Sequence, residues 1–214
     1  MRLQLAIDTL TLSEAEALVS RVRDLVDVVE VGTPLVIREG VGAVRRLRAV
    51  FPDLTLVADL KIADGGHFEA TLGFEAGARI VTVLAAAADE TIRDAVRAGH
   101  ERGGEVMVDL MGVSDLAGRA AEVDRLGVRW VCLHTPVDVQ RGDAERRAVE
   151  GLRRVKDVLR SAGTAVAGGI TAATAPALAA LRPDLVVVGS AIARAADPRA
   201  AATALRRALG EARP

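Results

Sequence analysis

The chain has 214 residues, half of them hydrophobic, and its 28 Lys and Arg residues nearly balance its 29 Asp and Glu residues. This length and composition predict one well-filled domain and exclude a largely disordered chain. Balanced charge and an aromatic content of 2% argue against a partner that is nucleic acid or a membrane, because such partners need a basic surface or stacking rings.

Three features of the sequence predict a cytoplasmic protein. The single cysteine, Cys132, cannot form an intramolecular disulfide, which fits a reducing compartment. The first residues reach the acidic Asp8 before any apolar stretch of signal-peptide length. No apolar run approaches the roughly 18 residues that a membrane span needs.

Short runs rich in β-branched residues alternate with helical segments along the chain. Strands are predicted at 3–8, 27–31, 55–59, 79–83, 105–110, 129–134, 164–167 and 184–188. Most of them start about 20 to 35 residues after the previous one, which is the spacing of repeated βα units rather than of hairpins.

Helix signals lie between these strands. The segment Ser13-Glu14-Ala15-Glu16 is interpreted as a capping box at the start of a helix. A helix through Val44 and Leu47 should end before Phe51-Pro52, and another over 66–76 should end at Gly77. Further helices are predicted at about 88–102, 115–126, 144–161, 172–181 and 197–211.

Eight strands, each followed by a helix, predict an α/β fold, a single (β/α)₈ TIM barrel over residues 1–214. An open doubly wound sheet has the same alternation of elements. Eight units in this length fit a trimmed barrel better, and the first βα turn lacks the Gly-x-Gly-x-x-Gly pattern of a dinucleotide-binding sheet.

Charged residues lie where the predicted strands end, at the catalytic end of a barrel. These residues are Asp8, Glu30, Asp59, Asp109 and His134. Because side chains alternate along a strand, those that share the inward face can be read from the sequence. The predicted inward set comprises Gln4, Ala6, Asp8, Val57, Asp59, Lys61, Trp130, Cys132 and His134.

The most informative local pattern is Asp59-Leu60-Lys61-Ile62-Ala63-Asp64. Asp59 and Lys61 share one face, and Asp64 lies in the following turn, from which it should reach across the same space. An acid beside Lys61 keeps the ammonium charged, so that it can stabilise a developing oxyanion. Glu30 and Asp59 offer the oxygen ligands that Mg²⁺ prefers. The alternative is an ionic network without chemistry.

Two glycine-containing turns follow the last two predicted strands, Ala167-Gly168-Gly169-Ile170 and Val188-Gly189-Ser190-Ala191. Glycines there let backbone N–H groups approach a phosphate, and barrels commonly bind phosphate at these positions. His134 is suited to act as an acid or base, or else is a core histidine satisfied by the backbone. These features predict a magnesium-assisted enzyme that acts on a small phosphorylated sugar.

Asp59-x-Lys61-x-x-Asp64, preceded by Asp8 and by Glu30-Val31-Gly32-Thr33-Pro34, resembles the orotidine 5′-phosphate decarboxylase superfamily. Within it, the chain is most similar to the 3-hexulose-6-phosphate synthase family. The similarity covers essentially the whole chain and includes Leu3-Gln4-Leu5-Ala6-Ile7-Asp8, Val57-Ala58-Asp59-Leu60-Lys61, Val108-Asp109-Leu110, His134-Thr135, Asp138-Val139-Gln140, Ala167-Gly168-Gly169-Ile170 and Val188-Gly189.

This resemblance implies a homodimeric lyase that uses Mg²⁺ and condenses formaldehyde with D-ribulose 5-phosphate, reversibly, to 3-hexulose 6-phosphate through an enediolate. It implies the following roles: Glu30 and Asp59 bind the metal; Lys61 stabilises the enediolate oxygens; His134 transfers a proton; Asp8 and Asp109 orient sugar hydroxyls; Asp64 enters the partner subunit's site; and Gly168, Gly169, Gly189 and Ser190 bind phosphate.

Two alternatives remain open. Lys61-Ile62-Ala63-Asp64 also resembles the 3-keto-L-gulonate-6-phosphate decarboxylases, but Val137 stands where those enzymes have an arginine that helps to protonate their intermediate. A non-catalytic phosphosugar-binding barrel is the second alternative, although every position implied to be catalytic holds a residue able to do the chemistry.

Overall fold

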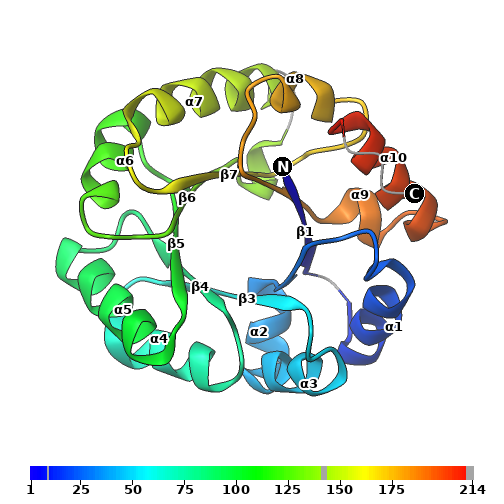
Figure 1. Cartoon of the computed structure of the whole chain (residues 1–214), viewed down its shortest axis with the longest axis horizontal. Coiled ribbons are helices and arrows are strands. Elements are labelled where there is room, and N and C mark those ends of the chain that lie inside the picture. The colour runs from blue at the N-terminus through cyan, green and yellow to red at the C-terminus, as the bar shows by residue number, and fades with distance from the viewer. Residues whose placement is uncertain (9, 141–143, 211–214) are drawn as a thin grey trace.

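The protein is a closed barrel of parallel strands with helices around it (Figure 1). The computed structural model describes residues 1–8, 10–140 and 144–210. Within these residues eight strands follow one another around the barrel in chain order, so β8 closes it against β1. They are β1 (Arg2–Ile7), β2 (Val28–Val31), β3 (Thr55–Ile62), β4 (Ile80–Leu84), β5 (Glu105–Asp109), β6 (Trp130–His134), β7 (Gly163–Ala167) and β8 (Leu185–Val188). The (β/α)₈ prediction is confirmed, and the open sheet is excluded.

The helices form the outer ring of the molecule (Figure 1). They are α1 (Leu12–Val22), α2 (Thr33–Glu39), α3 (Gly42–Val50), α4 (Gly66–Glu75), α5 (Asp89–Arg102), α6 (Leu116–Asp124), the 3₁₀ turn η1 (Val137–Val139), α7 (Ala144–Val158), α8 (Ala175–Ala179), α9 (Ser190–Ala193) and α10 (Pro198–Ala208). All helices predicted from the sequence are present; residue 211, the predicted end of the last one, lies outside the described residues.

Two details of the helix prediction were wrong. The capping box at the start of α1 is formed by Thr11 and Glu14, not by Ser13: the Thr11 side chain accepts from the backbone N–H of Glu14, and the Glu14 carboxylate accepts the Thr11 N–H at 2.7 Å. Helix α2 was not predicted from the sequence. Proline is compatible with the first turn of a helix, whose N–H groups have no partner within the helix.

The strand residues divide into an inward and an outward set, as side-chain alternation predicts. Leu3, Leu5 and Ile7 of β1 pack with the helices in the larger hydrophobic cluster. The interior of the barrel holds a smaller cluster, composed of Val28, Val57, Ile80, Met107, Trp130, Cys132, Ala165, Ala167, Leu185 and Val187. Beyond this filled floor, at the mouth where the strands have their C-terminal residues, a cavity opens that is lined by polar side chains.

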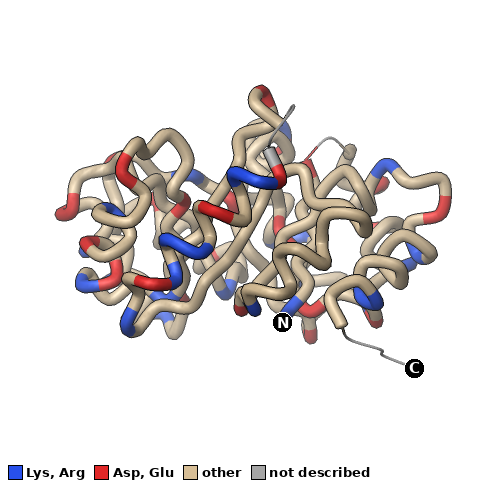
Figure 2. Tube along the Cα trace, turned by 90° about the horizontal axis from the view of Figure 1, so that it is seen from above, with Lys and Arg blue, Asp and Glu red and all other residues tan. Residues whose placement is uncertain are grey.

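The outer surface carries charges of both signs. Figure 2 shows Lys and Arg interspersed with Asp and Glu around the helices, in keeping with the net charge of -1. None of the helices in the described part of the chain is long and apolar enough to cross a bilayer.

The tight contact between α4 and α5 gives a test of the packing. A Cβ atom added to Gly66 would lie 1.9 Å from the carbonyl oxygen of Thr91, which is backbone and cannot move aside. We therefore expect Gly66→Ala to lower the free energy of unfolding, measured in urea, by about 1–3 kcal/mol. Gly42→Ala is the control, because nothing lies within 4 Å of its added Cβ and it should be neutral or slightly stabilising. Wild-type stability of Gly66→Ala would contradict this packing.

Candidate functional site

A cavity of about 520 Å³ opens at the end of the barrel where the strands have their C-terminal residues. Each strand, or the turn that follows it, contributes to its lining. Of the site residues predicted from the sequence, the cavity brings together Asp8, Glu30, Asp59, Lys61, Asp109, His134, Gly168, Gly169, Gly189 and Ser190. Asp64 is the exception.

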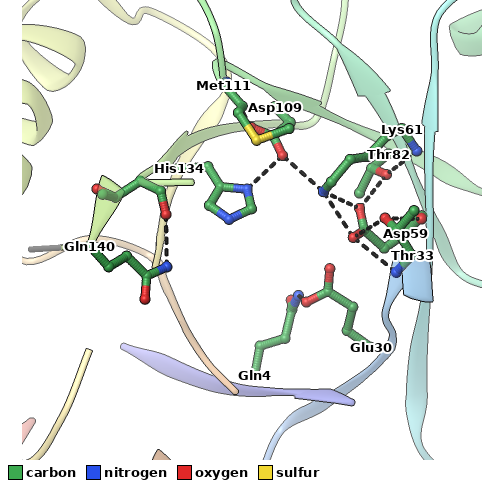
Figure 3. A network of polar contacts seen from close by, with 11 residues as sticks. Gln4, Glu30, Thr33, Asp59, Lys61, Thr82, Asp109, Met111, His134 and Gln140 are labelled. Carbon is green, nitrogen blue, oxygen red and sulfur yellow. Dashed lines mark hydrogen bonds and ion pairs between the residues drawn. The ribbon is translucent and has the colours of Figure 1, made fainter. Parts of the chain in front are cut away.

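Lys61 is held between two carboxylates in this cavity (Figure 3). Its Nζ lies 2.9 Å from both oxygens of Asp59 and 3.2 Å from Oδ2 of Asp109. Burial by itself would lower the pKa of Lys61, but the charges of Asp59 and Asp109 outweigh that effect and raise the pKa above its usual value. The side chain is therefore a fixed ammonium group rather than a base.

The backbone of Lys61 departs from regular strand geometry. Its φ of 47° is left-handed, and the pairing of β3 with β4 shifts register between Ala58 and Ile62. The Lys61 N–H donates to the side-chain oxygen of Thr82 at 2.9 Å, which secures this conformation. A residue of this kind in the left-handed region costs about 1–3 kcal/mol, and such strain is concentrated at functional sites.

Asp59 is oriented by donors from three elements. Besides Lys61, it accepts from Thr33 Oγ1 at 2.7 Å, at the start of α2, and from Thr82 Oγ1 at 2.7 Å, on β4. Neither threonine was identified from the sequence. Thr82 could have been found from the sequence, because it is a polar residue two positions after the inward-facing Ile80 of β4. Thr33 could not, because its position is set by helix α2, which was not predicted.

Asp109 links Lys61 to His134. Its Oδ2 lies 2.7 Å from His134 Nδ1, and its Oδ1 accepts the Met111 N–H at 2.8 Å. Burial opposes ionisation of Asp109, but the hydrogen bond and charge of His134, with Lys61, hold its pKa below the usual value. Because an ionised carboxylate only accepts, His134 carries a hydrogen on Nδ1, and its other ring nitrogen points into the cavity (Figure 3).

Glu30, on β2, and Asp8, directly after β1, have pKa shifts in the direction opposite to that of Asp109. Burial raises the pKa of Glu30 well above its usual range, and the charge of Asp59 raises it further. Burial also raises the pKa of Asp8, again with a contribution from Asp59. Glu30 accepts a 2.7 Å hydrogen bond from Gln4 Nε2. Burial on this side of the cavity therefore opposes ionisation of both carboxyl groups.

The carboxylates fit a hard divalent cation held in part by other ligands. Glu30 and Asp59 line the cavity from adjacent strands, and oxygen ligands suit Mg²⁺. Within the described residues, no cluster of three or more His, Cys, Asp or Glu side chains could hold a metal. The two carboxylates would therefore need water and substrate oxygens to complete the coordination shell.

The opposite wall of the cavity contains the glycine turns. Gly168 and Gly169 have φ values of 98° and 70°, and a Cβ on Gly168 would lie 2.1 Å from the Thr135 carbonyl oxygen. Only glycine fits at these positions, and no side chain separates the backbone from the cavity. Two further lining residues were not identified from the sequence: Gln140, which donates to the same carbonyl at 2.9 Å, and Arg194, which follows α9.

Asp64 lies away from this cavity. It is exposed in the turn between β3 and α4 and does not line the pocket of its own chain. The expectation that it reaches across the same space is therefore wrong within one chain, because β3 continues to Ile62 and the chain then turns outward. On α4, which starts two residues later, Phe68 and Leu72 are exposed apolar side chains.

Comparison with known proteins identifies the family. Residues 1–205 match the model of the orotidine 5′-phosphate decarboxylase / HUMPS family. The chain belongs to this family. It is 43% identical to the 3-hexulose-6-phosphate synthase of Bacillus subtilis over 98% of this chain and 99% of that protein.

Solved structures agree with this assignment. The 3-hexulose-6-phosphate synthase of Salmonella typhimurium matches with a TM-score of 0.93 and 44% identity over 98% of both chains. The 3-keto-L-gulonate-6-phosphate decarboxylase of Vibrio cholerae matches with a TM-score of 0.82 and 29% identity over 100% of this chain and 99% of that one. The chain is thus more similar to these synthases than to this decarboxylase.

The lowered pKa of Asp109 predicts how its contribution to stability depends on pH. Asp109→Asn should lower the free energy of unfolding by about 2 kcal/mol at pH 7, because it weakens the bonds to Lys61 and His134. The contribution of a carboxyl with a depressed pKa is complete above its unfolded value and is lost as the pH falls through the folded one. The difference in the free energy of unfolding between the wild type and Asp109→Asn should stay constant from pH 7 to 5. It should shrink only below pH 3.8, the ordinary pKa of an aspartate.

Urea denaturation at pH 7, 5 and 3 measures this difference. Asp53→Asn is the control, since Asp53 is an exposed acid 3.9 Å from Arg23 and should change stability little. A deficit in Asp109→Asn that grows as the pH falls would contradict the sign of the shift.

Proposed function

We propose that this protein is an aldehyde-lyase that condenses formaldehyde with D-ribulose 5-phosphate, reversibly, to 3-hexulose 6-phosphate. The observation that carries the proposal is the placement of a fixed ammonium, Lys61, beside His134 in a cavity whose far wall is the Gly168-Gly169 turn. The names of the full-length relatives support this choice of reaction.

The cavity has two chemically different ends, which would orient a sugar phosphate. Backbone N–H groups at the glycine turns would bind the phosphate, with Gly189 and Ser190 on the next turn. Asp8 packs between two turns, since a Cβ on Gly32 would lie 2.1 Å from its Oδ1 and one on Gly189 3.3 Å from its Oδ2. It would orient a sugar hydroxyl.

The reacting end would be the ionic cluster. Removing a proton beside the ketone of ribulose 5-phosphate gives an enediolate, whose negative oxygens Lys61 would stabilise from a position already fixed by Asp59 and Asp109. His134 would move the proton through the ring nitrogen that faces the cavity, while Asp109 holds the ring. The enediolate carbon then attacks formaldehyde, and the new alkoxide takes a proton. A Mg²⁺ ion on Glu30 and Asp59 would supply further stabilisation of the oxygens.

Metal removal tests this assignment. Turnover should be lost after treatment with EDTA and dialysis, and adding Mg²⁺ should restore it, because Lys61 alone must otherwise balance the charge on two oxygens. Condensation would be followed by the disappearance of formaldehyde in the presence of ribulose 5-phosphate. Full activity in excess EDTA would contradict the magnesium site, and binding without any turnover would favour a non-catalytic barrel.

The exposed position of Asp64 supports a homodimer in which this residue completes the site of the partner subunit. The apolar side chains Phe68 and Leu72, 69% and 40% exposed, lie on the helix that follows it, and an apolar face of this kind is typical of a subunit interface. In such a dimer Lys61 and Asp64 of one site would come from different chains.

Subunit complementation tests the shared site. Lys61→Ala and Asp64→Ala should each be nearly inactive, because each removes one group from both sites of its homodimer. Refolded together, they should regain activity, since one site of a heterodimer then has both groups intact. Each variant refolded alone is the control. Absence of recovery in demonstrated heterodimers would show that each subunit is self-sufficient.

Decarboxylation of 3-keto-L-gulonate 6-phosphate is the second candidate, favoured by the sequence Lys61-Ile62-Ala63-Asp64 and by the solved relative of that name. Val137 argues against it, because this side chain lines the cavity on η1. A decarboxylated enediolate must be protonated at carbon, which an arginine with its bound water can assist and an apolar valine cannot. Formaldehyde is small and tolerates an apolar wall.

The ratio of the two reactions tests this reading of Val137. The wild type should have a higher kcat/KM for condensation than for decarboxylation. Val137→Arg should shift the ratio of these two kcat/KM values toward decarboxylation, by an amount equivalent to about 1–3 kcal/mol of activation free energy. Val139→Arg is the matched control, because Val139 is on the same turn but outside the cavity lining. Faster decarboxylation than condensation by the wild type would show that the Lys61 to Asp64 segment is the better guide.

A further inference from the structure

Gln4 is a polar residue in the apolar part of the barrel. Its side chain is fully buried on β1, and its strand neighbours in the sheet register are Val28 and Val187. The surrounding interior cluster is hydrophobic. A methionine or leucine would fill this space without burying an amide, so packing alone does not explain a glutamine here.

The hydrogen bonds of Gln4 are one-sided. Its Nε2 donates to Oε2 of Glu30 at 2.7 Å, whereas its Oε1 is one of two buried side-chain oxygen or nitrogen atoms without a partner in the described part of the chain. An unsatisfied buried acceptor destabilises a fold. The bond to Glu30 is therefore the contact that distinguishes glutamine from an apolar side chain at this position.

That bond fixes the orientation of the Glu30 carboxylate. Gln4 donates a hydrogen bond to one oxygen of the carboxylate, and the second oxygen points toward the centre of the cavity (Figure 3). Glu30 and Asp59 line the same cavity from the paired strands β2 and β3, so the orientation of the Glu30 carboxylate decides whether both side chains can bind one cation. Hydrogen bonds to metal-binding carboxylates commonly set ligand orientation in this way.

We propose that Gln4 is a positioning residue that holds Glu30 in the orientation needed to bind a divalent cation. This inference rests on the proposed magnesium site and adds a residue to it. Gln4 acts through Glu30 and does not itself contact the cation.

Mn²⁺ binding to the purified full-length protein tests the role of Gln4. The free Mn²⁺ signal in electron paramagnetic resonance gives the dissociation constant without any turnover. Gln4→Met has a side chain of similar length but no donor, and it should weaken Mn²⁺ binding about tenfold or more. Its melting temperature without metal should stay close to that of the wild type, because the unpartnered oxygen is gone while the Glu30 carboxylate loses its donor.

Two further variants make the measurement decisive. Gln4→Leu tests the same loss in a different shape, and a cooperative thermal melt shows which variants are folded. Ile80→Val changes packing in the same interior cluster without touching a polar group and should leave Mn²⁺ affinity within about twofold of wild type.

The outcomes separate this inference from the proposed function. Weaker Mn²⁺ binding in the folded Gln4 variants, with the Ile80→Val affinity unchanged, supports the positioning role. Wild-type affinity in a folded Gln4→Met or Gln4→Leu overturns that role and leaves the magnesium site standing. A wild type that does not bind Mn²⁺ overturns both.

Discussion

The site depends on one ammonium group placed between two buried carboxylates. Lys61 contacts Asp59 at 2.9 Å and Asp109 at 3.2 Å, which lets a barrel mouth hold several acids that would otherwise repel one another. The acids farther from Lys61 behave differently, because burial first, and the charge of Asp59 second, raise the pKa values of Glu30 and Asp8. A cation bound there would favour their ionised forms.

The barrel makes this arrangement rigid. Asp59, Lys61, Asp109 and His134 lie on strands whose neighbours are fixed by the closed sheet, and the packed hydrophobic floor lies below them. The irregular end of β3 is the exception: the left-handed backbone of Lys61 is secured by Thr82, and the chain leaves the barrel directly afterwards. The same turn that places Lys61 inside therefore places Asp64 outside.

Stability and function make different demands on these interior residues. Gly168 is needed because its Cβ would collide with the Thr135 carbonyl, and Gln4 keeps an unsatisfied oxygen in a hydrophobic layer. Natural proteins commonly carry such costs at the sites where they act. These two costs lie in the mouth and in the layer directly beneath it, while a large hydrophobic cluster packs the strands against the helices.

The sequence by itself determined the order of elements, the barrel and the inward parity of Asp8, Asp59, Lys61 and His134, because alternation and strand-end position are local properties. The tertiary structure decided what these residues contact. Thr33 and Thr82 orient Asp59 from segments far apart in the chain. The position of Asp64 also depended on the path of the backbone. The three residues that follow Lys61 could have turned into the barrel mouth or away from it, and the irregular end of β3 determines that they turn away.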